Sequence, residues 1–168
     1  MVAIAFRFPA GRFHATPWGR HVNEAEVEWP PSPWRILRAL VATWHLKADV
    51  ERYPQTLLDG LVERLCEQLP AYRVPSGVRA HTRHYMPQAE RNIVRLTFDA
   101  NGHRVGWVAD PNNKKKTKPD TALVFDGFVR LAPDAELVAA WPDVELDAEQ
   151  MALLDALLRD LGFLGRGE

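Results

Sequence analysis

The stretch VAIAFRFPAGRFHATPWGRHVNEAEVEWPPSPWRILRALVATWH (Val2–His45) predicts a strand, a long loop and a helix in succession. Its first part, VAIAFRFP (Val2–Pro9), is rich in β-branched and aromatic residues and ends at a proline, which predicts a mostly buried strand. The helix is expected to begin at Ser32, whose hydroxyl can cap it, with Pro33 at the first helical position. Apolar residues at helical spacing then form one stripe: Trp34, Leu37, Leu40, Val41 and Trp44.

Two further helices are predicted by the same apolar spacing. One runs from Pro54 to Leu69 and includes the single cysteine, Cys66, which we expect in the core. The other runs from about Asp147 to Leu161. Asp147 and Gln150 can form a capping box at its start, and Gly162 supplies the stop.

Extended segments are predicted between these helices. They are AYRVP (71–75), VRAHTRHYMP (78–87), the hairpin NIVRLTFDANGHRVGWVA (92–109) with its turn at Asp99–Gly102, TALVFDGFVRLAP (121–133) and AELVAAW (135–141). The order predicts an α+β fold of the ferredoxin-like β-α-β-β-α-β type, with an insertion. No closing strand is predicted after Gly162, so we expect a longer protein.

Composition bounds the class of protein. The 168 residues suit one domain, and the net charge of −1 by itself favours no partner. The single cysteine excludes a disulfide within the chain and a cysteine-pair zinc site, and is compatible with a cytoplasmic location. No apolar run approaches the ~20 residues that span a bilayer, and MVAIAFRFPA is too short for a signal peptide.

Charge is distributed unevenly along the chain. Residues 73–118 hold 10 Lys/Arg against 3 Asp/Glu, whereas residues 119–168 hold 3 against 11. This favours one surface for a polyanion and another for a different partner. Alternatively, folding mixes the two blocks in space and the asymmetry disappears.

The loop before the first helix concentrates residues that contact nucleic acid. Arginine offers a planar donor fork to phosphate, tryptophan a face on which an unpaired base can stack, and histidine a proton donor or acceptor near neutral pH. These residues are Arg12, His14, Trp18, Arg20 and His21, and Arg35 and Arg38 follow on one flank of the helix. The alternative is that Phe13, Trp18 and Trp29 belong to the core, and that the histidines bond to backbone carbonyls.

Two later segments carry similar residues. In HTRHYM, strand alternation puts His81, Arg83 and Tyr85 on one face, with His84 and Met86 on the other, which is a poor spacing for one metal ion. The segment NNKKKTK concentrates lysines beside an arginine-bearing hairpin: Lys114, Lys115, Lys116, Arg95 and Arg104. It is either a solvated surface or a phosphate clamp. Phosphate-binding glycine loops and a nucleophile elbow are absent from the sequence, and we expect no cofactor.

Four stretches of the sequence resemble those of a known family. FRFPAGRFHATPWGRHVNEAEVEWPPSPWRILRALVATWH, AHTRHYMP, LVFDGFV and WPDVELD are similar to the Cas protein of the type I-U (I-G) CRISPR system, in which a fifth-family unit is fused to a sixth-family unit. Residues 1–168 resemble the fifth-family portion, which implies an RRM-like domain of the RAMP superfamily. The segment 89–118 is a longer insertion than the family leads us to expect. The sixth-family half is expected beyond residue 168.

The resemblance implies a crRNA-binding subunit of a Cascade surveillance complex. Such units hold the repeat-derived 5′ handle and cap the backbone, with the backbone and large subunits as partners and target DNA reached through the complex. With this resemblance we expect the loop to contact RNA through Arg12, Trp18, Arg20 and His21. The basic and aromatic segments themselves supply the other candidate contacts: Arg35, Arg38, His81, Arg83, Tyr85, Arg95, Arg104, Lys114, Lys115 and Lys116.

Two alternatives to RNA binding alone stay open. The family also processes precursor crRNA without metal through attack by a 2′-hydroxyl, and a ribonuclease site in this portion would use His14 or His21. The acidic final third could instead make the chain a protein–protein scaffold. In neither case do we expect a bound metal or a membrane.

Overall fold

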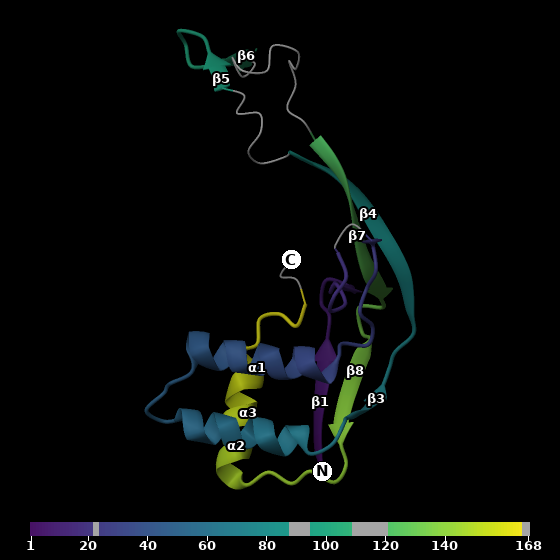
Figure 1. The fold of residues 1–168 in the computed structure, drawn as a ribbon, viewed down its shortest axis with the longest axis vertical. Helices are drawn as coiled ribbons and strands as arrows, with labels where there is room; N and C mark the ends of the chain where they lie inside the picture. Colours follow the sequence, from purple (N-terminus) through teal and green to yellow (C-terminus); the bar gives the residue numbers. More distant parts are fainter. Residues whose placement is uncertain (22–23, 88–94, 109–120, 166–168) are drawn as a thin grey trace.

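The computed structural model describes residues 1–21, 24–87, 95–108 and 121–165 (Figure 1). Within them the fold is α+β and has three helices: α1 (Pro33–Lys47), α2 (Gln55–Cys66) and α3 (Ala148–Asp160). The predicted fold class is therefore confirmed at this level. No helix among the described residues is long and apolar enough to cross a membrane.

A three-stranded antiparallel sheet forms the centre of the body. Its order is β1 (Val2–Arg7), β8 (Glu136–Trp141), β3 (Ala71–Arg73), with Val2 opposite Trp141 and Ala71 opposite Ala140. Because β1 and β3 are both antiparallel to β8, they run parallel to each other and are joined through α1 and α2. All three helices lie on one side of this sheet (Figure 1). This arrangement is compatible with a ferredoxin-like fold.

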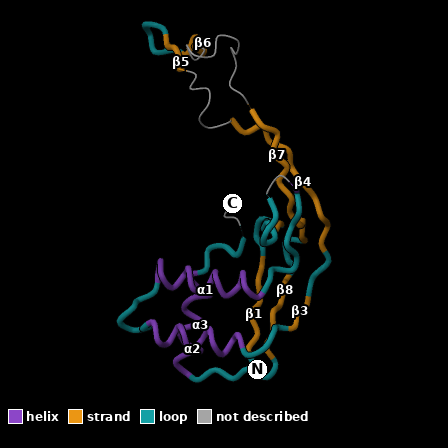
Figure 2. The backbone as a smooth tube through the Cα atoms, viewed as in Figure 1, coloured by secondary structure: helices purple, strands orange, loops and turns teal. Residues whose placement is uncertain are grey.

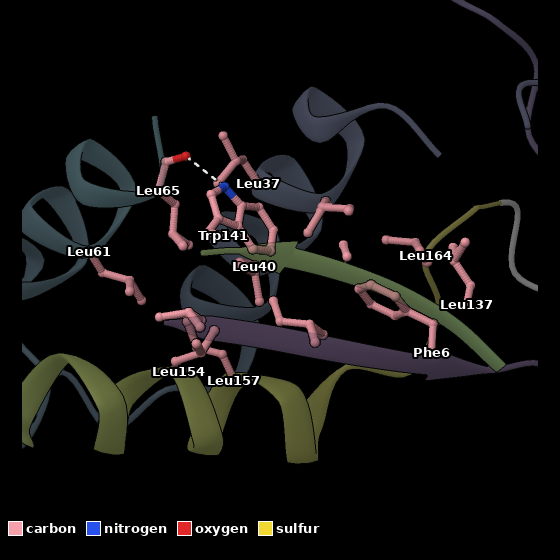
Figure 3. Close-up of a cluster of buried hydrophobic side chains, with 14 of the residues drawn as sticks. Phe6, Leu37, Leu40, Leu61, Leu65, Leu137, Trp141, Leu154, Leu157 and Leu164 are labelled. Carbon is pink, nitrogen blue, oxygen red and sulfur yellow. Dashed lines mark hydrogen bonds between the residues drawn. The ribbon is translucent and has the colours of Figure 1, made fainter. Parts of the chain in front are cut away.

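The buried core lies between this sheet and the helices. On β1 the side chains of Val2, Ile4 and Phe6 are buried and the intervening ones exposed, so the expectation of a mostly buried strand was wrong for one face. The cause is that only one face of the sheet is covered by helices. Figure 3 shows Trp141 at the centre of the core, where its indole Nε1 donates to the Leu65 carbonyl at 3.0 Å.

Helix α1 begins as predicted but buries a different face. The Ser32 hydroxyl accepts from the Arg35 amide and Pro33 follows it, which confirms the cap. The predicted stripe is wrong at its first member, since Trp34 is 58% exposed while Ile36 is buried. A face centred between positions 36 and 40 meets the sheet, and Trp34 lies outside it.

The ends of the other two helices depart little from expectation. Helix α2 stops at Cys66, three residues before Leu69, which is 81% exposed. Cys66 is exposed as well, so its expected place in the core was wrong: it lies on the solvent side of the last turn. The predicted capping box of α3 is confirmed, with Asp147 accepting from the Gln150 amide at 2.8 Å.

A second sheet extends from the body as an arm. Strands β4 (Gly77–Pro87) and β7 (Thr121–Leu131) pair antiparallel along their whole length, and β2 (Arg12–Phe13) adds to the base of β7. Figures 1 and 2 show β4 and β7 rising away from the helices, with loop segments beside their lower part. The sequence did not predict β2, because two residues carry no periodic signal.

The predicted hairpin is confirmed within its described part. Strands β5 (Arg95–Phe98) and β6 (Arg104–Val108) pair antiparallel. Asp99 closes the turn: its carbonyl accepts from the Gly102 amide at 3.0 Å, and its carboxylate accepts from the Asn101 and His103 amides. The basic loop with Lys114, Lys115 and Lys116 lies outside the described residues, as do both segments joining this hairpin to the arm.

Candidate nucleic-acid interface

The long loop between β2 and α1 is anchored at both ends. After His14 it leaves the sheet, and it returns where the Glu28 amide donates to the Ala15 carbonyl at 2.9 Å. Ala15 and Val27 are both buried. Ala25 lies directly against Gly127 of β7, where an added Cβ would collide with its carbonyl, so the loop rests on the arm.

An ion pair fixes the loop to helix α1. The Arg35 guanidinium donates from Nε and Nη2 to the Glu28 carboxylate at 3.0 and 2.8 Å, and from Nη2 to the Thr16 carbonyl at 2.8 Å. Burial opposes ionisation of Glu28. The hydrogen bonds from Arg35 and Ser32 and the charge of Arg35 outweigh it and hold the pKa of Glu28 below its ordinary value. The sequence predicts that Arg35 contacts RNA. In the structure, its guanidinium donates to Glu28 and Thr16 of the loop.

The same corner includes Tyr72 of β3. Its hydroxyl donates to the Pro31 carbonyl at 2.8 Å. Burial, followed by the negative charge of Glu28, raises the pKa of Tyr72 to about 12, so it stays a neutral donor at any physiological pH. The loop thus meets the helix in an arrangement held by several polar contacts.

The loop aromatics divide between core and surface. Phe13 and Trp29 pack with Phe8, with ring centroids 5.3 to 6.0 Å apart, as the core alternative predicted. Trp18 is 83% exposed and does not belong to the core. The loop therefore has two roles: Phe13 and Trp29 near its ends pack in the body, and Trp18 is exposed to solvent.

A hollow of about 230 Å³ lies beside Trp18, and we call it the aromatic hollow. Three rings line it, from Trp18, from Trp34 of α1 and from Phe163 after α3, and the last two are 58% and 62% exposed. The Arg38 guanidinium lies 5.9 Å from the Trp34 ring centroid. The hollow thus brings together three of the predicted RNA contacts, Trp18, Arg35 and Arg38, with Trp34 and Phe163, which the sequence did not indicate as contacts.

The arm carries exposed arginines on both of its faces. Arg12 lies opposite Arg130, on β2 and β7 respectively. On the other face, Arg83 lies 5.1 Å from the Phe125 ring centroid and His81 lies 5.9 Å from it, which confirms that these two share a face. The four exposed arginines of β2, β4 and β7 are Arg12, Arg79, Arg83 and Arg130.

Asp126 is the one carboxylate on these three strands, and two histidines flank it. His14 Nε2 lies 2.7 Å from Asp126 Oδ1, and His84 Nε2 lies 3.5 Å from Oδ2 and 3.2 Å from the Thr82 hydroxyl. The side chains of His14 and Asp126 are 6% and 15% exposed, whereas that of His84 is 50% exposed. Half of the His84 side chain is therefore accessible to solvent, whereas His14 and Asp126 are mostly covered.

The remaining predicted residues lie apart from these groups or outside the description. Arg20 pairs with Glu24 and Glu26 at 3.5 and 3.2 Å, and His21 is exposed on the same loop. The backbone places three others on strands whose side chains are not described: Tyr85, Arg95 and Arg104. Among the described residues, no group of three His, Cys, Asp or Glu has the arrangement of a metal site.

The face of the central sheet that the helices leave open is not aromatic. It consists of small apolar side chains and one ion-pair cluster in which Arg7 and Arg73 both reach Glu136, at 3.2 and 2.9 Å. The small side chains are Ala3, Ala5, Ala71, Val138 and Ala140. In an RRM, the aromatic side chains that stack bases lie on the equivalent open face of the sheet. In this chain, the exposed aromatic and basic side chains lie on the arm and on the loop before α1.

In the described part of the chain the charge asymmetry of the sequence survives folding only in part, since Arg73 of the basic block pairs with Glu136 of the acidic block, and Asp126 of the acidic block lies on the arm. The acidic side chains Asp143, Glu145, Glu149 and Asp155 are exposed on α3 or in the turn before it, at the opposite end of the molecule from the arm (Figure 1). Comparisons of the chain with protein-family models, with curated proteins and with solved structures found no match.

Proposed function

We propose that this chain binds single-stranded RNA through the arm and the adjoining loop. The observation that carries the proposal is the charge of the arm: four exposed arginines against one carboxylate, which is mostly buried between two histidines. On these three strands the arginines outnumber the carboxylates, and a surface with such an excess of positive charge attracts a polyanion and gains affinity by releasing counterions.

The aromatic side chains favour an unpaired strand over a duplex. Phe125 lies on the arm beside Arg83 and His81, and Trp18 stands exposed on the loop. Bases within a duplex are already stacked and present only their edges, whereas unpaired bases can stack on such rings.

The finer identity rests on the family resemblance of the sequence. In this proposal the strand is the repeat-derived 5′ handle of crRNA, and the domain is the fifth-family RAMP portion of a type I-U (I-G) Cas protein within Cascade. The central sheet order β1-β8-β3 supports a ferredoxin-like domain, since it matches three of the four strands of that fold in order and direction. The hairpin β5–β6 would act as a thumb beside the handle.

The test is salt-dependent binding of a fluorescently labelled repeat RNA in EDTA. Neutralising Arg79, Arg83 and Arg130 together to glutamine should weaken binding for every RNA sequence. It should also lower the slope of log affinity against log salt by about 2, since each phosphate neutralised on a single strand accounts for ~0.7 of that slope.

A matched control neutralises three cations on the helical body. Lys47, Arg52 and Arg159 are exposed there, and their replacement by glutamine changes net charge by the same amount. This control should keep both the affinity and the salt slope of the wild type. Equal losses in the two triple variants would mean that total charge, not the arm, governs binding, and a wild type without RNA affinity would favour the scaffold alternative.

The cluster of His14, Asp126 and His84 favours a second candidate function, metal-independent RNA cleavage. The Asp126 carboxylate lies 2.7 Å from His14 Nε2 and 3.5 Å from His84 Nε2, and half-exposed His84 can reach a bound strand. His84 would take the proton of a 2′-hydroxyl as that oxygen attacks the adjacent phosphorus. The bond from phosphorus to the 5′ oxygen then breaks, that oxygen takes up the proton, and a 2′,3′-cyclic phosphate remains.

This candidate is separated from binding alone by the products. Cleavage in EDTA that yields a cyclic phosphate, falls at least about 100-fold in His84→Ala and leaves RNA affinity intact would establish it. His21→Ala, on the exposed part of the loop, serves as the comparison. Intact RNA after incubation with the wild type would rule cleavage out for this portion.

A further inference from the structure

We infer that the aromatic hollow holds one unstacked nucleobase of the bound strand, between the rings of Trp18, Trp34 and Phe163. This inference rests on the proposed function and names the ligand group of a site next to the arm. Its starting point is that three large rings from three separate segments stand mostly exposed around one hollow.

The walls and floor suit a flat aromatic ligand. Tryptophan and phenylalanine faces stack on any base, since every base has a π face. The floor is formed by Ala39 and Ala42 of α1, whose short side chains leave room between the rings. Ligand pockets for drug-sized molecules measure about 300–1,000 Å³. At about 230 Å³ this hollow suits a group the size of a single base.

Charge at the rim complements the phosphates that flank such a base. Arg38 lies over Trp34, and the described residues offer it no acidic partner. Arg35 also lines the hollow, but its charge is paired with Glu28, so it positions the wall. Glu28 lines the hollow too and is the partner of Arg35, so the charge left at the rim is that of Arg38. An apolar centre with this cation beside it fits a base attached to a ribose-phosphate chain better than an apolar peptide.

The hollow is preformed. Trp18 belongs to a loop segment that is held by the Arg35–Glu28 ion pair and by the bond from Arg35 to the Thr16 carbonyl. Trp34 lies in the first turn of a capped helix. Phe163 is followed by buried Leu164. A site whose walls are already ordered loses less conformational entropy on binding.

The hollow also adjoins the base of the arm through one residue. Gly165 lines it and lies so close to His14 that an added Cβ would collide with the His14 carbonyl. His14 in turn contacts Asp126 of β7. A strand that follows the arm can therefore place one of its bases in the hollow without leaving the protein surface.

The test uses a series of short single-stranded oligoribonucleotides, each with one 2-aminopurine at a different position. A matching series carries an abasic site at the same positions. Binding should quench 2-aminopurine fluorescence at one position only. Trp18→Ala and Phe163→Ala should each weaken binding about 5- to 150-fold, the ratio for ~1–3 kcal/mol per stacked base. Neither variant should weaken the abasic oligonucleotide. Leu69→Ala, at an exposed apolar residue outside the hollow, should change nothing.

Two results would overturn the inference while sparing the proposed function. One is wild-type affinity in Trp18→Ala and Phe163→Ala while the arm variant Arg79→Gln/Arg83→Gln/Arg130→Gln loses binding. The other is an equal loss for the abasic and the base-bearing oligonucleotide, which would make the rings general packing. If Trp18→Ala instead changes the oligomeric state without affecting RNA, a second copy occupies the hollow. A wild type that binds none of these oligonucleotides overturns both proposals.

Discussion

The body and the arm of this protein use the same β-structure in opposite ways. In the body, β1 and β8 bury every second side chain against three helices, and Ile4, Leu137 and Trp141 are almost completely inaccessible. In the arm, β4 and β7 pair over eleven residues, but among those whose burial is described only Gly127, Val129 and Leu131 are buried, all near the base.

This difference shows that different physical requirements act on the amino-acid sequence of the two regions. The body is held by apolar burial, which provides the main stabilising free energy of a domain. The arm is a two-stranded ribbon, which is marginal by itself in water. Its exposed arginines and histidines contribute little to folding and give the arm a positive electrostatic potential, which is the property on which the proposed RNA binding depends.

The largest expected effect is on stability in the body. Trp141→Ala removes a buried ring and leaves the Leu65 carbonyl without its indole donor, so the free energy of unfolding should fall by about 3–5 kcal/mol. Urea unfolding followed by circular dichroism measures this. Trp18→Ala is the matched control and should stay within about 0.5 kcal/mol of the wild type. Similar losses of unfolding free energy in Trp141→Ala and Trp18→Ala would contradict the assignment of Trp141 to the core and of Trp18 to the surface.

A smaller effect is expected where the loop joins the body. Glu28→Gln should lower the free energy of unfolding at neutral pH by about 1–3 kcal/mol, because Arg35 loses a charged partner. The pKa of Glu28 is lowered in the fold, so its contribution is complete above the unfolded value near 4.5 and is lost as pH falls through the folded pKa.

The difference between wild type and Glu28→Gln should therefore shrink on acidification below about pH 4.5. Thermal unfolding measured from about pH 3 to about pH 8 would follow this difference, because that range extends to both sides of the ordinary pKa of 4.5. A difference that stays constant over this range would show that the carboxylate charge does not hold the loop.

The smallest effect on stability, and a clear one on binding, is expected for the basic loop between β6 and β7. Neutralising Lys114, Lys115 and Lys116 together should leave unfolding unchanged. It should weaken RNA binding for all sequences and lower the salt slope by about 2. An unchanged salt slope would limit the interface to the arm and the loop before α1.

Much of the fold could be predicted from the sequence because local signals agreed with it. The Ser32 cap, the Asp147–Gln150 capping box and the Asp99–Gly102 turn each depend on residues within a few positions of each other. The arm could not be foreseen as a separate ribbon. Pairing between β4 and β7 spans an insertion, and strand alternation does not show which strands share a sheet.

For the candidate site, the sequence named some residues that the structure leaves accessible. Trp18 and Arg20 of the loop are exposed, and their predicted contact with RNA stays a prediction. Asp126 was missed, since a single acid inside LVFDGFV has no pattern, although an isolated carboxylate in an apolar strand is itself a signal. Trp34 was assigned to the core because its spacing fits the stripe, and only the packing of α1 shows that the buried face begins at Ile36.

The central claim, that the arm and the aromatic hollow grip an unpaired RNA strand, is tested most directly by photocrosslinking. A repeat RNA with 4-thiouridine at successive positions would be irradiated with the protein, and the attached peptides identified by mass spectrometry. We expect crosslinks on residues 77–87, on residues 121–131 and at Trp18 or Phe163. Crosslinks confined to the acidic surface of α3, or to the alanine face of the central sheet, would contradict it.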